Sequence, residues 1–112
     1  MSKPQGTFQD NNIQIIRWEK PDPISQEEAE ARLSQEGYET YRWHDVSGAS
    51  YPRHRHGFDE CLWILKGQFQ LTIGEQTYHL KAGDRIYLPA TTVHSSFVAD
   101  PNGVTYLVGR KN

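Results

Sequence analysis

The sequence predicts an all-β domain, an antiparallel sandwich or barrel, with one short helix near its N-terminus. Its length of 112 residues is enough for one hydrophobic core and too short for two. From Tyr38 onward, short segments rich in β-branched and aromatic residues are separated by turn signals about every eight to twelve residues. Residues 25–37 carry the signals of a helix. Because parallel strands need crossover helices between them, this spacing of short strands favours an antiparallel sheet.

An N-terminal extension, residues 1–37, is expected to precede a barrel formed by residues 38–112. Residues 1–12 are polar and have no hydrophobic period, so we expect them to be mobile or fixed only at their end. Residues 13–18 favour a strand, and the Pro21-Asp22-Pro23 segment then turns the chain.

The helix is predicted from signals at both of its ends. Ser25 and Glu28 have the spacing of a capping box, in which the serine oxygen accepts a hydrogen bond from an early amide of the helix. Gly37 marks its end. Ala29 and Leu33 form a narrow apolar face, so we expect the helix to pack on the barrel as a lid or brace, without a catalytic role.

The strands of the barrel are marked by turns and by alternation. One hairpin is legible, because residues 69–73 alternate apolar and polar side chains, residues 74–76 turn the chain, and a second strand follows through Leu80. The expected turns lie at Gly48, Gly57, Gly67, Gly74, Gly83, Pro89 and residues 100–103.

The strand that begins at Glu60 is apolar on both faces. Leu62 and Ile64 share one face, and Cys61 and Trp63 share the other. Both faces of such a strand must be buried, one by the barrel interior and the other by the N-terminal segment or another subunit. From this we predict a homodimer.

Composition excludes several classes of partner. The formal charge is −2, and basic residues are interspersed with acidic ones, so no nucleic acid is expected as a partner. No apolar run approaches the roughly 20 residues that cross a bilayer, and residues 1–12 lack the order of a signal peptide. Cys61 is the single cysteine, so no disulfide supports the fold. We expect a soluble, cytoplasmic protein.

Three of the five histidines lie in two segments whose spacing indicates a metal site. His54 and His56 are two residues apart, so on a strand their rings project from one face. Glu60 follows a short turn at Gly57 and can lie opposite them, and His94 from a distant strand can close the site. An isolated pair of alternating histidines is usually a surface feature, but a spaced carboxylate and a third histidine in register favour ligation.

The two segments resemble the two sequence motifs of the cupin superfamily. The first reads Gly48, His54, His56, Glu60 and Gly67 at the spacing G-x5-H-x-H-x3-E-x6-G, and it is complete. The second motif, G-x5-P-x-G-x2-H-x3-N, is matched by Gly83, Pro89 and His94. This chain departs from it at Thr91, which replaces the second glycine, and at Val98, which replaces the asparagine. The resemblance implies a single cupin barrel, a jelly-roll-like double-stranded β-helix, with His54, His56, Glu60 and His94 as metal ligands.

Three imidazoles and one carboxylate suit one divalent transition metal, Fe, Mn, Ni, Zn or Cu, and in an octahedral site leave about two positions for water, substrate or dioxygen. Structural zinc sites more often use cysteine thiolates. The resemblance implies an enzyme for a small organic substrate, with a dioxygenase-type oxidoreductase slightly favoured by analogy of fold. The alternatives are a cupin isomerase or decarboxylase and a module that senses a ligand or binds metal without turnover.

Other side chains are predicted with less support from the pattern. Candidates for the pocket beside the metal are Tyr51, Phe58, Gln70, Tyr87, Ser96 and Tyr106. His44 and His79 match no ligand position, Cys61 is expected to point away from the metal as a packing residue, and Arg53 and Arg55 are expected to be solvated.

Overall fold

The computed structural model describes residues 13–112. The expectation for residues 1–12 concerns a stretch outside these residues. The described part of the chain contains the helix α1 (Gln26–Gln35) and the strands β1 (Gln14–Ile16), β2 (Glu39–Asp45), β3 (Ser50–His54), β4 (Asp59–Ile73), β5 (Gln76–Lys81), β6 (Arg85–Leu88), β7 (His94–Phe97) and β8 (Val104–Lys111). Within these residues, no helix has the length and apolar character needed to span a membrane.

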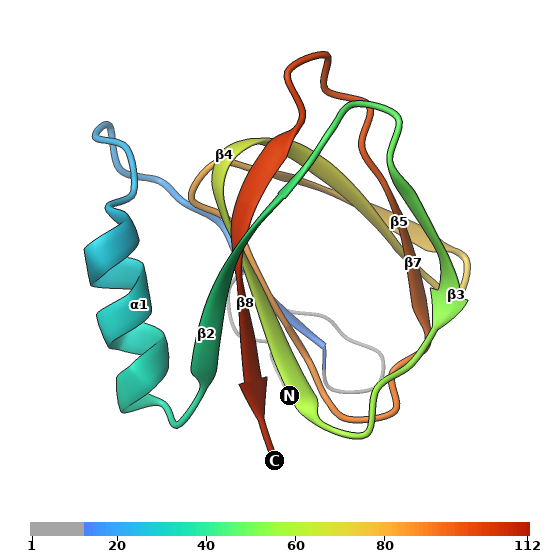
Figure 1. Ribbon diagram of the computed structural model, residues 1–112, viewed down its shortest axis with the longest axis horizontal. Coiled ribbons are helices and arrows are strands. Elements are labelled where there is room, and N and C mark those ends of the chain that lie inside the picture. The colour runs from blue at the N-terminus through green and yellow to red at the C-terminus, as the bar shows by residue number, and fades with distance from the viewer. Residues whose placement is uncertain (1–12) are drawn as a thin grey trace, which may run out of the picture.

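Two antiparallel sheets face each other and share the long strand β4 (Figure 1). One sheet has the order β1-β6-β4-β8-β2, and the other has the order β3-β7-β4-β5. β4 curves from the first sheet into the second, and its register with β8 shifts between Ile64 and Lys66. The all-β fold with one short helix, predicted from the sequence, is confirmed.

Side chains that alternate along β4 divide the core into two clusters. Leu62 and Ile64 point into the barrel, where they join a cluster with Phe69, Leu71, Ile86 and other apolar residues. Cys61 and Trp63 point the opposite way and form a second cluster outside the barrel. The two apolar faces predicted for this strand are therefore both buried.

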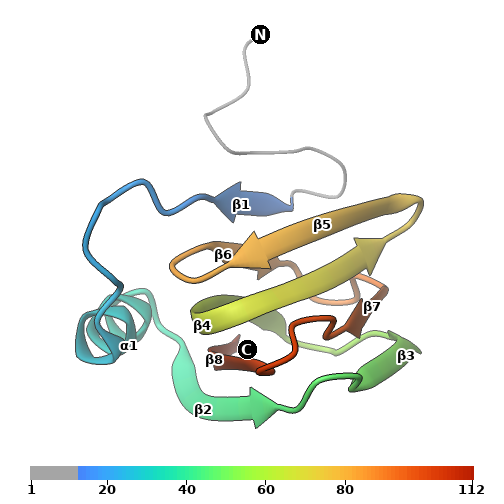
Figure 2. The same ribbon diagram turned by 90° about the horizontal axis from the view of Figure 1, so that it is seen from above.

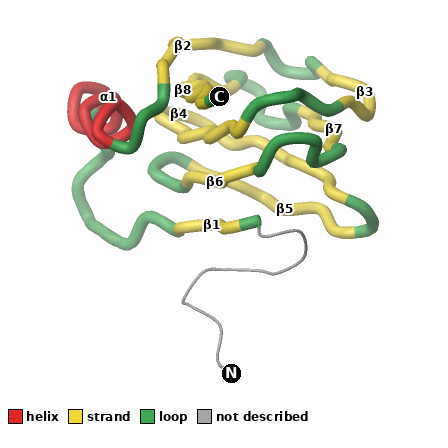
Figure 3. The backbone as a smooth tube through the Cα atoms, turned by 90° about the horizontal axis from the view of Figure 1, so that it is seen from below, coloured by secondary structure: helices red, strands yellow, loops and turns green. Residues whose placement is uncertain are grey.

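The helix supplies the outer cover. Ser25 caps it by accepting a hydrogen bond from the Glu28 amide at 3.3 Å, as predicted. Ala29 and Leu33 are fully buried against the Cys61 and Trp63 cluster. α1 thus lies on the outside of the barrel beside β2, as Figures 2 and 3 show from two further directions. Because the cover comes from the same chain, β4 does not require a second subunit, and the homodimer stays a prediction.

A buried carboxylate ties the segment before the helix to the barrel. Asp84 follows the turn between β5 and β6 and is fully buried. Its oxygens accept hydrogen bonds from the Trp18 amide at 2.8 Å, the Lys81 amide at 3.0 Å and the Arg17 guanidinium at 2.9 Å. The Trp18 side chain lies directly over Gly83, which has a φ of +94°. The segment that leads to α1 is fixed by these contacts.

Candidate metal centre

The strands bring the four predicted ligands to one place. His54 ends β3, Glu60 is the second residue of β4, and His94 begins β7. His54 and His94 are register partners across β3 and β7, and His56 lies in the segment between β3 and β4. The sheet pairing therefore joins residues that are 40 positions apart in the sequence.

The side chains converge within coordination reach. Each of the three histidines offers a ring nitrogen, and these nitrogens lie within 4.8 Å of one another. The Glu60 Oε1 atom lies 3.7 Å from His94 Nε2 and 3.8 Å from His56 Nε2. A ligand donor binds a first-row divalent ion at about 2 Å, so an ion between these atoms could contact all of them after small adjustments.

Hydrogen bonds set the orientation of two rings. His54 Nδ1 lies 2.7 Å from the Pro52 carbonyl oxygen, and His94 Nδ1 lies 2.9 Å from the Thr92 carbonyl oxygen. A carbonyl oxygen can only accept, so Nδ1 carries the proton in each ring and Nε2 keeps its lone pair. The His56 ring is instead stacked on Phe58, with 4.8 Å between ring centroids. These contacts aim the Nε2 lone pairs of His54 and His94 at the site, as metal-binding histidines require.

The electrostatics of the site suit a cation. Glu60 Oε1 is buried and has no hydrogen-bond partner among residues 13–112. Burial raises the pKa of Glu60 to about 6, although the charges of His54 and Arg110 oppose this. Burial also lowers the pKa of His56 and His94, which favours neutral imidazoles. Neutral nitrogens facing an orphaned carboxylate oxygen are the donor set that a divalent transition metal satisfies, so these residues fit such an ion.

The ligands form one wall of a cavity of about 610 Å³. Besides the ligands, its lining residues are Tyr41, Trp43, Tyr51, Pro52, Leu62, Phe69, Leu71, Ser96, Tyr106, Val108 and Arg110. Aromatic and aliphatic side chains make up most of this surface, and the volume lies in the range of small-molecule sites.

Three of the six pocket candidates line this cavity, namely Tyr51, Ser96 and Tyr106. Phe58 does not line it, but contacts both the His56 ring and the guanidinium of Arg110. Gln70 is displaced by strand alternation, because its neighbours Phe69 and Leu71 point inward.

Tyr87 also does not line the cavity. It is the register partner of Cys61, whose side chain belongs to the outer cluster. Its hydroxyl donates a 2.7 Å hydrogen bond to the Glu36 carboxylate, beyond the end of α1. Tyr87 therefore belongs to the outer face of the sheet.

Sequence reasoning missed Asp45. This buried residue ends β2, and its Oδ1 accepts hydrogen bonds from Tyr51 Oη at 2.7 Å and Trp43 Nε1 at 3.0 Å, while its Oδ2 accepts one from Tyr106 Oη at 2.7 Å. The carboxylate thus joins three strands around the cavity. Alternation along residues 41–45 places Tyr41, Trp43 and Asp45 on one face, and this was the available signal.

The other predictions for single residues agree with the structure. His44 Nδ1 lies 2.8 Å from the Thr105 hydroxyl, His79 is exposed, and Cys61 is fully buried away from the ligands. Arg53 and Arg55 are exposed.

The two motif departures have local effects. Thr91 stands where the motif has glycine, and its φ of 68° lies in the left-handed region that glycine favours. Its amide donates a 2.7 Å hydrogen bond to the His56 carbonyl oxygen. The turn therefore still forms and holds the backbone of a ligand. Val98 is fully buried in the barrel core.

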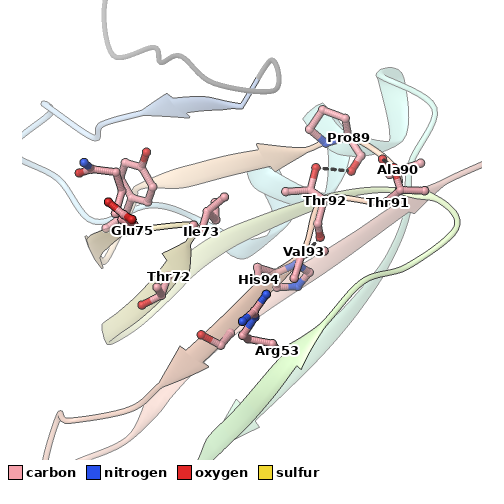
Figure 4. Close-up of a pocket in the computed structure, with 14 residues that line it drawn as sticks. Arg53, Thr72, Ile73, Glu75, Pro89, Ala90, Thr91, Thr92, Val93 and His94 are labelled. Carbon is pink, nitrogen blue, oxygen red and sulfur yellow. Dashed lines mark hydrogen bonds between the residues drawn. The ribbon is translucent and has the colours of Figure 1, made fainter.

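A second hollow of about 970 Å³ lies beside His94 and away from the other ligands. Figure 4 shows it between the β4–β5 turn, with Thr72, Ile73 and Glu75, and the segment from Pro89 to His94. Among the four ligands only His94 lines it, although it is the larger hollow. The cavity that contains all four ligands is therefore the better candidate for chemistry.

An antiparallel β barrel with three histidines and a glutamate beside an apolar cavity is the architecture of a cupin, and this cluster of side chains is consistent with a metal ion. The family comparison agrees, since residues 41–108 match the model of the cupin domain. The chain belongs to this family. The comparison with curated proteins found no match to this chain.

Solved structures share the fold. DMSP lyase DddQ from Ruegeria pomeroyi DSS-3 is 25% identical with a TM-score of 0.62, and the match covers 68% of this chain and 39% of the lyase. KdgF from Halomonas sp. is 17% identical with a TM-score of 0.59, covering 100% of this chain and 86% of that one. The polyketide cyclase RemF from Streptomyces resistomycificus is 19% identical with a TM-score of 0.60, covering 65% of this chain and 53% of the cyclase. This chain thus matches well under half of the lyase.

Proposed function

We propose that this cupin is a metal-dependent enzyme for a small organic substrate, with His54, His56, Glu60 and His94 as the ligands of one divalent transition metal. The observation that carries the proposal is the buried Oε1 of Glu60, which has no hydrogen-bond partner among the described residues and faces two imidazole nitrogens at 3.7 and 3.8 Å. A bound ion would supply Lewis-acid polarisation of a substrate oxygen or a site for dioxygen.

The residues of the chain would bind and orient the substrate. Leu62, Phe69 and Val108 provide apolar contacts in the cavity. The hydroxyl groups of Tyr51 and Tyr106 each donate a hydrogen bond to the Asp45 carboxylate. The pKa of Tyr51 is raised, first by this hydrogen bond, and that of Tyr106 is raised by burial and then by the same carboxylate. Both phenols therefore keep their protons at neutral pH, and their oxygens can accept hydrogen bonds from a substrate hydroxyl.

For the reaction itself, the first candidate is a dioxygenase. An ion held by these four residues would supply a centre at which a substrate and dioxygen could meet. The test is oxygen uptake by the iron-loaded protein with small phenols, thiols and diketones. Tight binding of one of them without oxygen uptake would contradict the dioxygenase and favour a ligand sensor.

The second candidate is a lyase, cyclase, isomerase or decarboxylase that uses no oxygen. Two observations favour it: the similarity to a lyase at 25% identity, and the two phenols that hold protons beside the ligands. Anaerobic incubation with the same compounds, followed by mass spectrometry, separates the two candidates. Conversion without oxygen supports this class, and conversion that needs oxygen contradicts it.

The metal proposal has its own measurement. Elemental analysis of protein purified without added metal should find close to one equivalent of a transition metal per chain. Protein that stays metal-free, even after incubation with each of the five candidate ions, would contradict the proposed function.

A further inference from the structure

Arg110 lies beside the proposed metal ligands, at a position that sequence analysis did not single out. It is the register partner of Glu60 across β8 and β4. In an antiparallel pair, register partners share a face of the sheet, and Tyr106 and Val108 share that face by alternation along β8. All three β8 residues line the cavity. The basic side chain therefore stands on the same wall as a ligand.

Two aromatic rings hold the guanidinium. Its central carbon lies 4.8 Å from the centroid of the Phe58 ring and 5.4 Å from that of Tyr41. Phe58 in turn stacks on the ligand His56. Contacts of this kind attract the cation through the ring face and leave the N–H donors at its edge available. Phe58 therefore links the guanidinium of Arg110 to the ring of His56.

No carboxylate of residues 13–112 forms an ion pair with Arg110. The contrast with Arg17 is informative, because Arg17 pairs with Asp84 at 2.9 Å. Glu60 is opposite Arg110 in the ladder, yet its buried Oε1 lies near the histidines instead. Arg110 is exposed, but unlike a freely solvated arginine its guanidinium lies against two aromatic rings beside the cavity.

We propose that Arg110 binds the carboxylate of the substrate, so that this cupin takes a small organic acid with an apolar body. The inference rests on the proposed function of the same cavity. The planar guanidinium can donate two parallel hydrogen bonds to a carboxylate. Trp43, Leu62 and Phe69 offer the surface for the body of the molecule. A phosphate is less suited, because no other lysine or arginine lines the cavity.

The test uses benzoate and its neutral isostere benzamide as probes of the protein as purified. Tryptophan fluorescence or calorimetry gives the dissociation constants. Wild-type protein should bind benzoate at least about tenfold more tightly than benzamide, the ratio expected for one charge-assisted contact. Arg110→Gln should weaken benzoate binding about tenfold and leave benzamide unchanged, and Arg110→Lys should keep part of the preference, because lysine lacks the planar fork.

Arg55→Gln is the matched control, since it removes the same charge from an exposed residue next to two ligands in sequence. It should leave both constants unchanged. The proposal is overturned if benzoate shows no saturable binding at millimolar concentrations, if Arg110→Gln affects both probes equally, or if Arg55→Gln has the same effect.

Metal content of each protein separates this inference from the proposed function. A wild-type protein that holds metal but shows no benzoate preference contradicts the role of Arg110 alone. A protein that stays metal-free after incubation with each of the five candidate ions, yet still prefers benzoate through Arg110, contradicts the metal-dependent function and supports the carboxylate site.

Discussion

Among the proposed ligands, His56 is the easiest to test alone, because its ring is partly exposed and its contact with Phe58 is a stacking contact. We expect His56→Ala to lower metal affinity by more than tenfold, since loss of a ligand costs at least as much as loss of the groups that orient one. Elemental analysis after dialysis measures this. His79→Ala is the control and should keep full occupancy, and equal losses in the two variants would mean that the ligands are misassigned.

Asp45 is buried, and its carboxylate accepts three hydrogen bonds. Asn in its place keeps the shape but loses the charge and puts an NH₂ group where an acceptor is needed. We expect Asp45→Asn to lower the free energy of unfolding by about 2–4 kcal/mol, because bonds to charged groups contribute more than neutral ones. Urea denaturation measures the change. Asp22→Asn, at an exposed position, should change it by less than about 0.5 kcal/mol, and a similar loss in both would contradict the argument.

At the scale of single residues, the convergence of His54, His56, Glu60 and His94 could be predicted from strand alternation and from the spacing of the two motifs. Asp45 and Arg110 could not be placed in the same way. Their roles depend on pairs such as Glu60 with Arg110 and Asp45 with Tyr106, which are separated by 50 and 61 residues. Only the register of β8 against its two neighbours creates these contacts, and a single sequence does not state that register.

Among the elements, α1 is the one whose packing is most open to test. Leu33 is fully buried between the helix and the outer face of the sheet. We expect Leu33→Ala to destabilise the protein by about 2–4 kcal/mol, as other buried leucine truncations do. Metal content should not change, because the cluster lies outside the barrel.

The control for Leu33→Ala is Val46→Ala, which shortens an apolar side chain that is 67% exposed. It should cost less than about 0.5 kcal/mol. Denaturant titrations of both variants provide the comparison. A stable Leu33→Ala protein would mean that the helix is not the outer cover of β4.

Elements with strong local signals were predicted well. The capping box and Gly37 bracket the helix within two residues, and the hairpin of β4 and β5 turns at Gly74 as expected. The sequence did not decide what packs on the outer face of β4. The N-terminal segment and another subunit were both possible, because either can provide an apolar surface. Gln70 and Tyr87 were predicted to line the cavity and do not. Which side of a curved strand faces the cavity depends on how all the strands of the sheet pair, and a single sequence does not give that pairing.

For the whole molecule, the predicted homodimer now depends on surfaces other than the buried faces of β4. Strand β2 pairs only with β8, so its other edge is unpaired among the described residues and offers its backbone groups to a second strand. We expect a dimer in solution. Light scattering at micromolar concentration measures the mass, and a monomer would contradict the prediction.

Stability of the whole fold should fall at alkaline pH because of its tyrosines. Burial raises the pKa of Tyr38 to about 12 and is the main reason that the pKa values of Tyr87 and Tyr106 lie above their usual range. In the unfolded chain these phenols ionise near pH 10. Above that pH the unfolded state therefore binds fewer protons than the folded state, and the free energy of unfolding decreases as pH rises.

Each pH unit above 10 should thus cost about 1.4 kcal/mol for a phenol as buried as Tyr106, while stability stays flat with respect to these groups below pH 10. Urea midpoints between about pH 8 and pH 11, together with phenolate absorbance of the folded protein, measure both sides of this linkage. Tyr87→Phe removes one of the phenols and should make the decline less steep, even though it also loses the hydrogen bond to Glu36 at every pH. If the folded protein ionises all its tyrosines near pH 10 and the midpoints do not fall, the phenols are less buried than their packing between the sheet, the helix and the cavity requires.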